Sequence, residues 1–109
     1  MNDKEAENYK KADKELNTIY NKILKDYKTD TKFILKIKEA QKAWIKFRDA
    51  EMNALFPVED KNLEYGSVFP MCWSMSLTSL TKDRTKKLKI WANGIKEGDA
   101  CSGSIKIKD

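Results

Sequence analysis

The chain has 109 residues, 36% of them charged, with four glycines and two prolines, a composition typical of one domain built from amphipathic helices. It contains no histidine, which excludes Ser-His and Cys-His nucleophile pairs and removes the commonest zinc ligand. We therefore expect a protein that is not an enzyme and that holds no cofactor or metal ion.

The first two helices are predicted at residues 3–27 and at about residues 31–55. Apolar residues of the first helix keep the three-or-four spacing of one helical face, and Asp13 lies beside that face. Asp30 or Thr31 can cap the second helix, and Pro57 ends it. The inner positions of the second helix are predicted to be Phe33, Ile34, Ile37, Ala40, Gln41, Trp44, Arg48, Met52 and Leu55.

Residues 40–49 (AQKAWIKFRD) carry the clearest structural signal within the second helix. Trp44 and Arg48 are four residues apart, which puts both on one face of the helix. Burying an unpaired charge is very costly, so a cation on this face needs a partner. The same holds for Arg84 in the third predicted helix. We expect a buried structural network in which Asp13 and Glu39 are the leading partners of the two arginines.

Beyond Pro57 the helical period is lost, and turn residues predict one long exposed loop over residues 57–70. A third helix is predicted from about Pro70 to Asn93, followed by a polar tail. Its expected inner stripe is Trp73, Leu77, Leu80, Arg84, Leu88, Trp91 and Ile95. The predicted fold is all-α, a three-helix antiparallel up-and-down assembly. A single domain covers residues 1–96, and a C-terminal tail covers residues 97–109.

The formal net charge is +5, from 22 basic and 17 acidic residues. Lysines alternate with acidic residues along the predicted helices, which indicates solvated helix faces. The densest basic run lies at residues 82–89 (KDRTKKLK), and neither a base-stacking aromatic platform nor a glycine-rich loop accompanies it. Nucleic-acid binding is therefore only a minor alternative.

Three segments, in this order and spacing, carry a family resemblance: residues 9–20 (YKKADKELNTIY), 40–51 (AQKAWIKFRDAE) and 65–88 (YGSVFPMCWSMSLTSLTKDRTKKL). Together they resemble the bacterial LprI-type lysozyme inhibitor family. The resemblance implies a small all-helical exported domain, periplasmic, secreted or lipid-anchored. For some members it implies inhibition of host lysozyme.

The predicted loop is the candidate contact surface for a protein partner, because long loops in compact domains are often functional. It combines local acidity with an aromatic tip, and its candidate contact residues are Glu59, Asp60, Glu64, Tyr65, Gly66, Ser67 and Phe69. Lysozyme is the sharper candidate partner. The alternative left open is a structural or interaction module of the cell envelope without lysozyme activity.

The two cysteines, Cys72 and Cys101, are expected to form a disulfide. At ~1.5 Å per residue, Cys72 and Asn93 lie ~31 Å apart along a helix, and the chain from Asn93 to Cys101 spans at most about 27 Å. A bridge therefore requires the tail to return along the third helix as a nearly straight strap, and it would indicate an oxidising compartment. The alternative is two unpaired thiols.

No apolar run approaches the roughly 20 residues that span a membrane. No signal peptide is visible in residues 1–14, and we presume that one has been removed.

Overall fold

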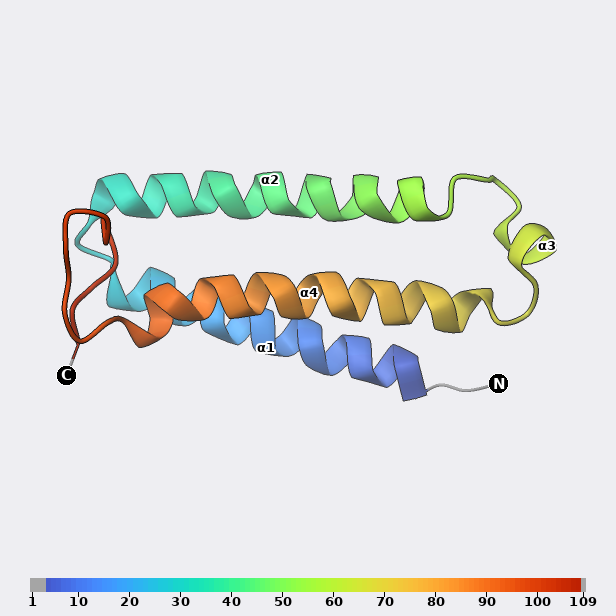
Figure 1. The fold of residues 1–109 in the computed structure, drawn as a ribbon, viewed down its shortest axis with the longest axis horizontal. Helices are drawn as coiled ribbons and strands as arrows, with labels where there is room; N and C mark the ends of the chain where they lie inside the picture. The colour runs from blue at the N-terminus through green and yellow to red at the C-terminus, as the bar shows by residue number, and fades with distance from the viewer. Residues whose placement is uncertain (1–3, 109) are drawn as a thin grey trace.

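The three long helices begin and end close to where the sequence predicts them. The computed structural model describes residues 4–108, so the predicted helix start at residue 3 and the last tail residue, 109, lie outside it. The long helices are α1 (Lys4–Asp26), α2 (Thr31–Leu55) and α4 (Phe69–Asn93) (Figure 1). Asp30 caps α2, as expected, because its carboxylate accepts a 3.2 Å hydrogen bond from the backbone N–H of Phe33. The all-α class is confirmed.

The prediction of an uninterrupted loop after α2 is wrong. A fourth helix, α3, occupies Lys61–Tyr65 inside the segment that the sequence assigns to the loop. Five residues are too few to show a helical period in the sequence, so periodicity alone cannot find such a helix. The segment is therefore a folded element that bridges the end of α2 and the start of α4 (Figure 1).

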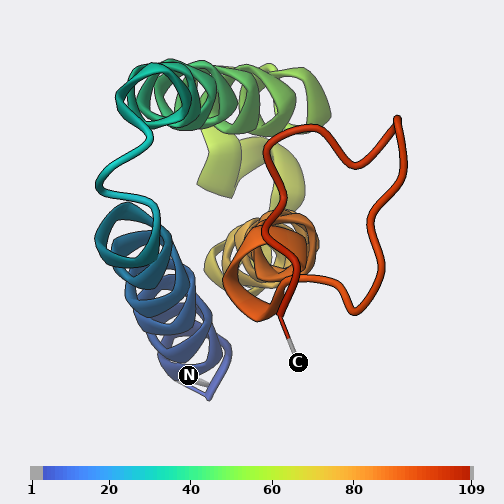
Figure 2. The same ribbon diagram turned by 90° about the vertical axis from the view of Figure 1, so that its left-hand side faces the viewer.

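The long helices are not packed equally closely. The chain reverses direction at each connection between them, and α1 packs chiefly against α4, while α2 lies further out above α4 (Figures 1 and 2). The molecule measures 51 × 23 × 21 Å, and its radius of gyration is 17.1 Å. A compact domain of this length would have a radius of gyration of about 13 Å. The molecule is therefore elongated, and its two ends are far apart.

The main apolar core lies toward the end where α1 turns into α2. Its buried members are Leu16, Ile23, Tyr27, Phe33, Ile37, Leu88 and Ala92. The rings of Tyr27 and Phe33 are 4.8 Å apart between centroids, and Phe33 is 6.0 Å from Trp91. Trp44, predicted to face inward, is partly buried and packs against this core.

The face of α4 that is most buried differs from the predicted stripe. Thr78, Thr81 and Thr85 are at most 8% exposed, whereas Trp73, Leu77, Leu80 and Trp91 are only partly buried. Small threonine side chains allow close approach of helices, and two of the hydroxyls are satisfied within α4. Thr78 donates to the carbonyl of Ser74 at 2.8 Å and Thr85 to that of Thr81 at 3.0 Å.

The tail from Gly94 to Lys108 folds back on itself at the end of the core. Ile95 and Ile107 form a parallel bridge, with hydrogen bonds from Ile95 N–H to the Lys106 carbonyl and from Lys108 N–H to the Ile95 carbonyl. Gly94 turns the chain at φ = +72°, a conformation that favours glycine. The tail therefore stays at one end of the molecule instead of returning along α4 (Figure 1).

This course of the tail contradicts the predicted disulfide. Cys72 lies in the first turn of α4, whereas Cys101 lies in the tail beyond the opposite end of that helix. Both are free thiols, Cys101 exposed and Cys72 half-buried. The strap on which the prediction depended does not form, because the tail is closed on itself by the Ile95–Ile107 bridge. Within residues 4–108, no helix is both long and apolar enough to cross a membrane.

Candidate protein-binding site at the α3 end

Both ends of α3 are capped, which explains how so short a helix forms. Asp60 precedes it, and its carboxylate accepts a 3.1 Å hydrogen bond from the backbone N–H of Leu63. Gly66 follows it at φ = +81° and donates its N–H to the carbonyl of Asn62 at 2.8 Å. Asp60 and Gly66, both predicted as contact residues, therefore also define the helix itself.

Four aromatic rings fix α3 to the rest of the molecule. Phe56, at the end of α2, is buried and contacts Tyr65, Phe69 and Trp73, with centroid distances of 5.3, 5.1 and 5.9 Å. The rings of Tyr65 and Phe69 stack at 5.9 Å. The prediction of an exposed aromatic tip is therefore wrong: Tyr65 and Phe69 are half-buried and pack against Phe56.

The residues that α3 and its flanks present to solvent are acidic and aliphatic. Glu59, Asp60, Glu64 and Ser67 are exposed, as expected for a contact surface. Leu63 is 82% exposed and Val68 is 54% exposed, although both are large apolar side chains. Sequence reasoning overlooked these two. Leu63 lies between Asn62 and Glu64 in a segment without a helical stripe, and this polar setting is the signal that could have revealed it, whereas Val68 has no such signal.

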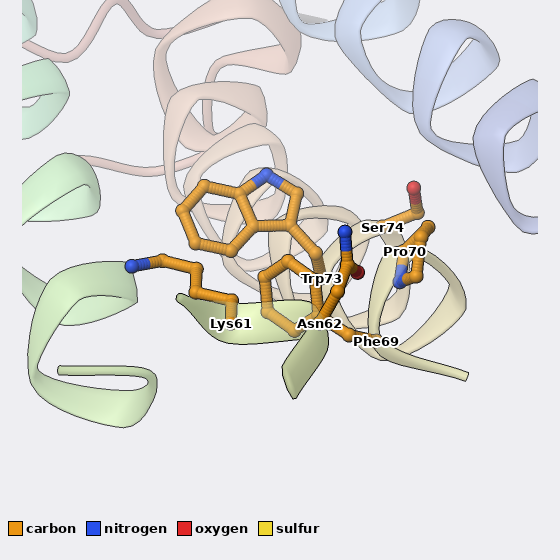
Figure 3. Close-up of a pocket in the computed structure, with 6 residues that line it drawn as sticks. All are labelled: Lys61, Asn62, Phe69, Pro70, Trp73 and Ser74. Atoms are coloured by element: carbon orange, nitrogen blue, oxygen red, sulfur yellow. The ribbon is translucent and has the colours of Figure 1, made fainter. Parts of the chain in front are cut away.

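A shallow hollow of about 440 Å³ lies beside α3, against the first turns of α4. Its lining residues are Lys61, Asn62, Phe69, Pro70, Trp73 and Ser74. In Figure 3 the rings of Phe69 and Trp73 lie next to each other, with Asn62, Pro70 and Ser74 on one side of them and Lys61 extending away on the other. Lys61 also donates to the carbonyl of Val58 at 2.7 Å, which holds that lysine near the start of α3.

Arg84, predicted to belong to a buried network with a carboxylate, has a different partner. Arg84 donates from Nε to Oε1 of Gln41 at 2.9 Å, so its partner is an amide and not a carboxylate. One of its terminal nitrogens, Nη2, is buried without a hydrogen-bond partner among the described residues. Burial lowers the pKa of the Arg84 guanidinium, and the nearby Tyr20 partly opposes this shift. Burial raises the pKa of Tyr20, because in both side chains it disfavours the charged form.

Neither Asp13 nor Glu39 pairs with an arginine. Arg48 lies over the ring of Trp44, 5.6 Å from its centroid, and forms an ion pair of 2.9 Å with the adjacent Asp49. Glu39 is exposed and pairs with Lys36, and Asp13 accepts a long hydrogen bond from Asn17. The predicted pairing with Asp13 or Glu39 is wrong because Arg48 reaches the carboxylate of Asp49, the next residue of α2. Burial, reinforced by Asp13, raises the pKa of Tyr9.

A scan against models of known families gives one decisive observation. The model described as lysozyme inhibitor LprI matches residues 1–88. The chain belongs to the LprI family.

The LprI match contains α1, α2, α3 and most of α4, and it ends before the tail. The α3 end of the molecule (residues 57–69) therefore lies within the LprI part of the chain, whereas the Ile95–Ile107 bridge lies outside it. No curated protein and no solved structure matches the chain. The LprI description names an inhibitor and not a catalyst, which fits a non-enzymatic protein.

Proposed function

We propose that this protein acts by binding another protein through the α3 end, and that lysozyme is the partner it inhibits. The observation that carries the proposal is Leu63, an 82% exposed leucine on a helix held in place by two caps and an aromatic cluster, within the segment that matches the LprI family. A large apolar side chain that a capped and packed helix holds in solvent gains free energy when a partner covers it, which favours an interface here.

Local charge supports a basic partner. The whole chain carries +5, which slows association with basic proteins such as the animal lysozymes. Residues 57–69 contain three acidic residues, Glu59, Asp60 and Glu64, against the single basic Lys61, so this end alone has a net charge of −2. Charges around an apolar centre steer association and select partners. The α3 end thus offers a locally acidic surface that suits a basic lysozyme.

The same proposal includes export. A protein that meets host lysozyme has to act in the periplasm, at the cell surface or in secretion. The family description supports this location. The inhibitor needs no catalytic group of its own, because occupying the cleft or its rim is sufficient to exclude substrate.

Turbidity loss of a bacterial cell-wall suspension by lysozyme, with and without this protein, tests the proposal. We expect inhibition by the unaltered protein, and a loss of inhibition of at least tenfold for Leu63→Asp, because a buried hot-spot residue contributes roughly 2 kcal/mol or more. Leu35→Asp is the matched control, since Leu35 is also exposed, at 63%, but lies on α2.

A charge-reversal pair separates local from net charge. Glu59→Lys with Glu64→Lys should weaken inhibition, whereas Glu39→Lys with Glu97→Lys makes the same change in net charge away from α3 and should not. Asp60 is left intact because it caps the helix. No inhibition by the unaltered protein would refute the lysozyme partnership and leave the alternative of an envelope interaction module.

A further inference from the structure

The hollow beside α3 combines apolar ring faces with polar side chains. Phe69, Pro70 and Trp73 supply apolar faces, and Asn62, Ser74 and Lys61 complete the lining (Figure 3). Its volume of about 440 Å³ lies within the roughly 300–1,000 Å³ of small-molecule sites.

Three hydrogen-bonding groups of this hollow form no hydrogen bond with any residue that the structure describes. They are the side-chain amide of Asn62, the hydroxyl of Ser74 and the indole N–H of Trp73. By contrast, the indole N–H of Trp91 donates to Ser104 at 3.0 Å. The three groups of the hollow are therefore available to a ligand that offers both donors and acceptors.

We propose that this hollow binds a neutral saccharide chain that carries N-acetyl groups. The apolar C–H face of a sugar ring packs on aromatic side chains, and an acetamido group needs one acceptor and one donor. Asn62 supplies both, and the indole N–H of Trp73 and the hydroxyl of Ser74 bind sugar hydroxyls or the acetyl oxygen.

Other ligand classes fit the hollow less well. A purely apolar side chain would leave the amide, hydroxyl and indole N–H desolvated and unpaired, which is unfavourable. A nucleic acid or a phosphorylated ligand would approach an end where Glu59, Asp60 and Glu64 outnumber Lys61, and phosphate binding requires positive charge. A neutral sugar satisfies the polar groups without bringing negative charge.

The site does not depend on lysozyme binding. Lys61 and Asn62 line the hollow, whereas Leu63 and Glu64 do not. Lysozyme cleaves glycosidic bonds, so a saccharide site next to the proposed lysozyme contact would keep the inhibitor on the polymer that the enzyme attacks.

NMR titration of the ¹⁵N-labelled full chain with tri-N-acetylchitotriose tests this proposal. We expect saturable shifts of the Trp73 indole N–H and the Asn62 side-chain amide, and unchanged indole signals for Trp44 and Trp91. Cellotriose, which has the same linkage without N-acetyl groups, should bind at least fivefold more weakly, because it lacks about one hydrogen bond.

Asn62→Ala should weaken chitotriose binding about fivefold or more, and Asn21→Ala, an exposed residue of α1, should not change it. The substitution keeps the Asn62 carbonyl that accepts from Gly66. If Asn62→Ala nevertheless unfolds α3, Ser74→Ala takes its place and should weaken chitotriose binding by a similar factor. The absence of a saturable Trp73 shift, equal binding of the two sugars, or undiminished binding by both variants would overturn the proposal. Failure of the lysozyme assay alone would leave it intact.

Discussion

The backbone N–H of Lys106 donates a 2.9 Å hydrogen bond to the phenol oxygen of Tyr27, 79 positions earlier in the chain. The same phenol donates to the carbonyl of Trp91 at 2.9 Å, and the Tyr27 side chain is fully buried. One side chain of the α1–α2 turn therefore joins the end of α4 to the tail. The tail is a packed part of the fold, although the LprI match does not include it.

Tyr27→Phe should destabilise the protein by about 2 kcal/mol, because it removes both hydrogen bonds and leaves a partly buried carbonyl and N–H unpaired. Urea unfolding followed by circular dichroism measures the change. Tyr65→Phe is the matched control, since the phenol of Tyr65 forms no hydrogen bond among the described residues. Equal stability of the two variants would contradict the structural role of Tyr27.

Gly94→Ala should loosen the tail more than Gly103→Ala. Both glycines have positive φ, +72° and +57°, which strains any other residue by roughly 1–2 kcal/mol. A Cβ at Gly94 would also lie 2.8 Å from the Lys106 carbonyl and 2.7 Å from the Lys108 side chain, whereas a Cβ at Gly103 meets nothing within 4 Å. Hydrogen exchange of the Lys108 amide compares them. A larger effect at Gly103 would show that the close approach at Gly94 is unimportant.

The tail should also loosen in acid through Asp26. Hydrogen bonds from Lys22 and Lys108 hold the pKa of Asp26 below its ordinary value of 3.8. The stabilisation is therefore fully present above the pKa of the unfolded chain and is lost as the pH falls from about 3.8 through the lower folded-state pKa. We expect protection of the Lys108 amide against exchange, corrected for intrinsic rates, to fall in this window. Asp26→Asn should lack that step, and Asp83→Asn should retain it.

The Arg84–Gln41 pair should behave as a coupled unit. Gln41→Leu leaves the Nε of Arg84 without its acceptor and should lower the free energy of unfolding by about 1–2 kcal/mol. Adding Arg84→Met to Gln41→Leu should restore the free energy of unfolding to that of the unaltered protein, or raise it by up to about 1 kcal/mol above that value. Apolar replacements of partly buried charged pairs are often neutral or stabilising. A double-mutant cycle in urea measures the coupling. Additive losses would show that the two side chains do not depend on each other.

The long helices could be predicted because their signals are local. Apolar spacing and the Asp30 cap depend on neighbouring residues only, and both hold in the structure. The buried face of α4 could not be predicted by hydrophobicity, since Thr85 is 2% exposed while Leu80 of the same helix is only partly buried. Threonine is ranked as polar, but its hydroxyl can bond within its own helix, as that of Thr85 does, and its small size then favours burial.

The sequence predicts a candidate contact segment over residues 57–70, but which of its side chains are exposed could not be predicted correctly. Acidity and lost period marked residues 57–70, where α3 now lies. Which side chains face solvent depends on the aromatic cluster around Phe56, a contact set between three separate elements. Tyr65 and Phe69, predicted to be exposed, are therefore half-buried. Leu63 and Val68, which were not predicted as contact residues, are exposed. The cysteine prediction failed for a similar reason, because the course of the tail depends on the distant Tyr27.

The pairing of α1 with α4 also determines when the chain can fold. Protein synthesis delivers α1 first, yet its main packing partner is the last long helix. Until α4 has been made, the inward face of α1 can pack only against residues of α2 such as Phe33, and the contacts with Leu88 and Ala92 of α4 are missing. Folding is therefore a late event for the whole domain, not a stepwise addition of helices. Most of the core of this chain is therefore still unformed while the chain is being synthesised.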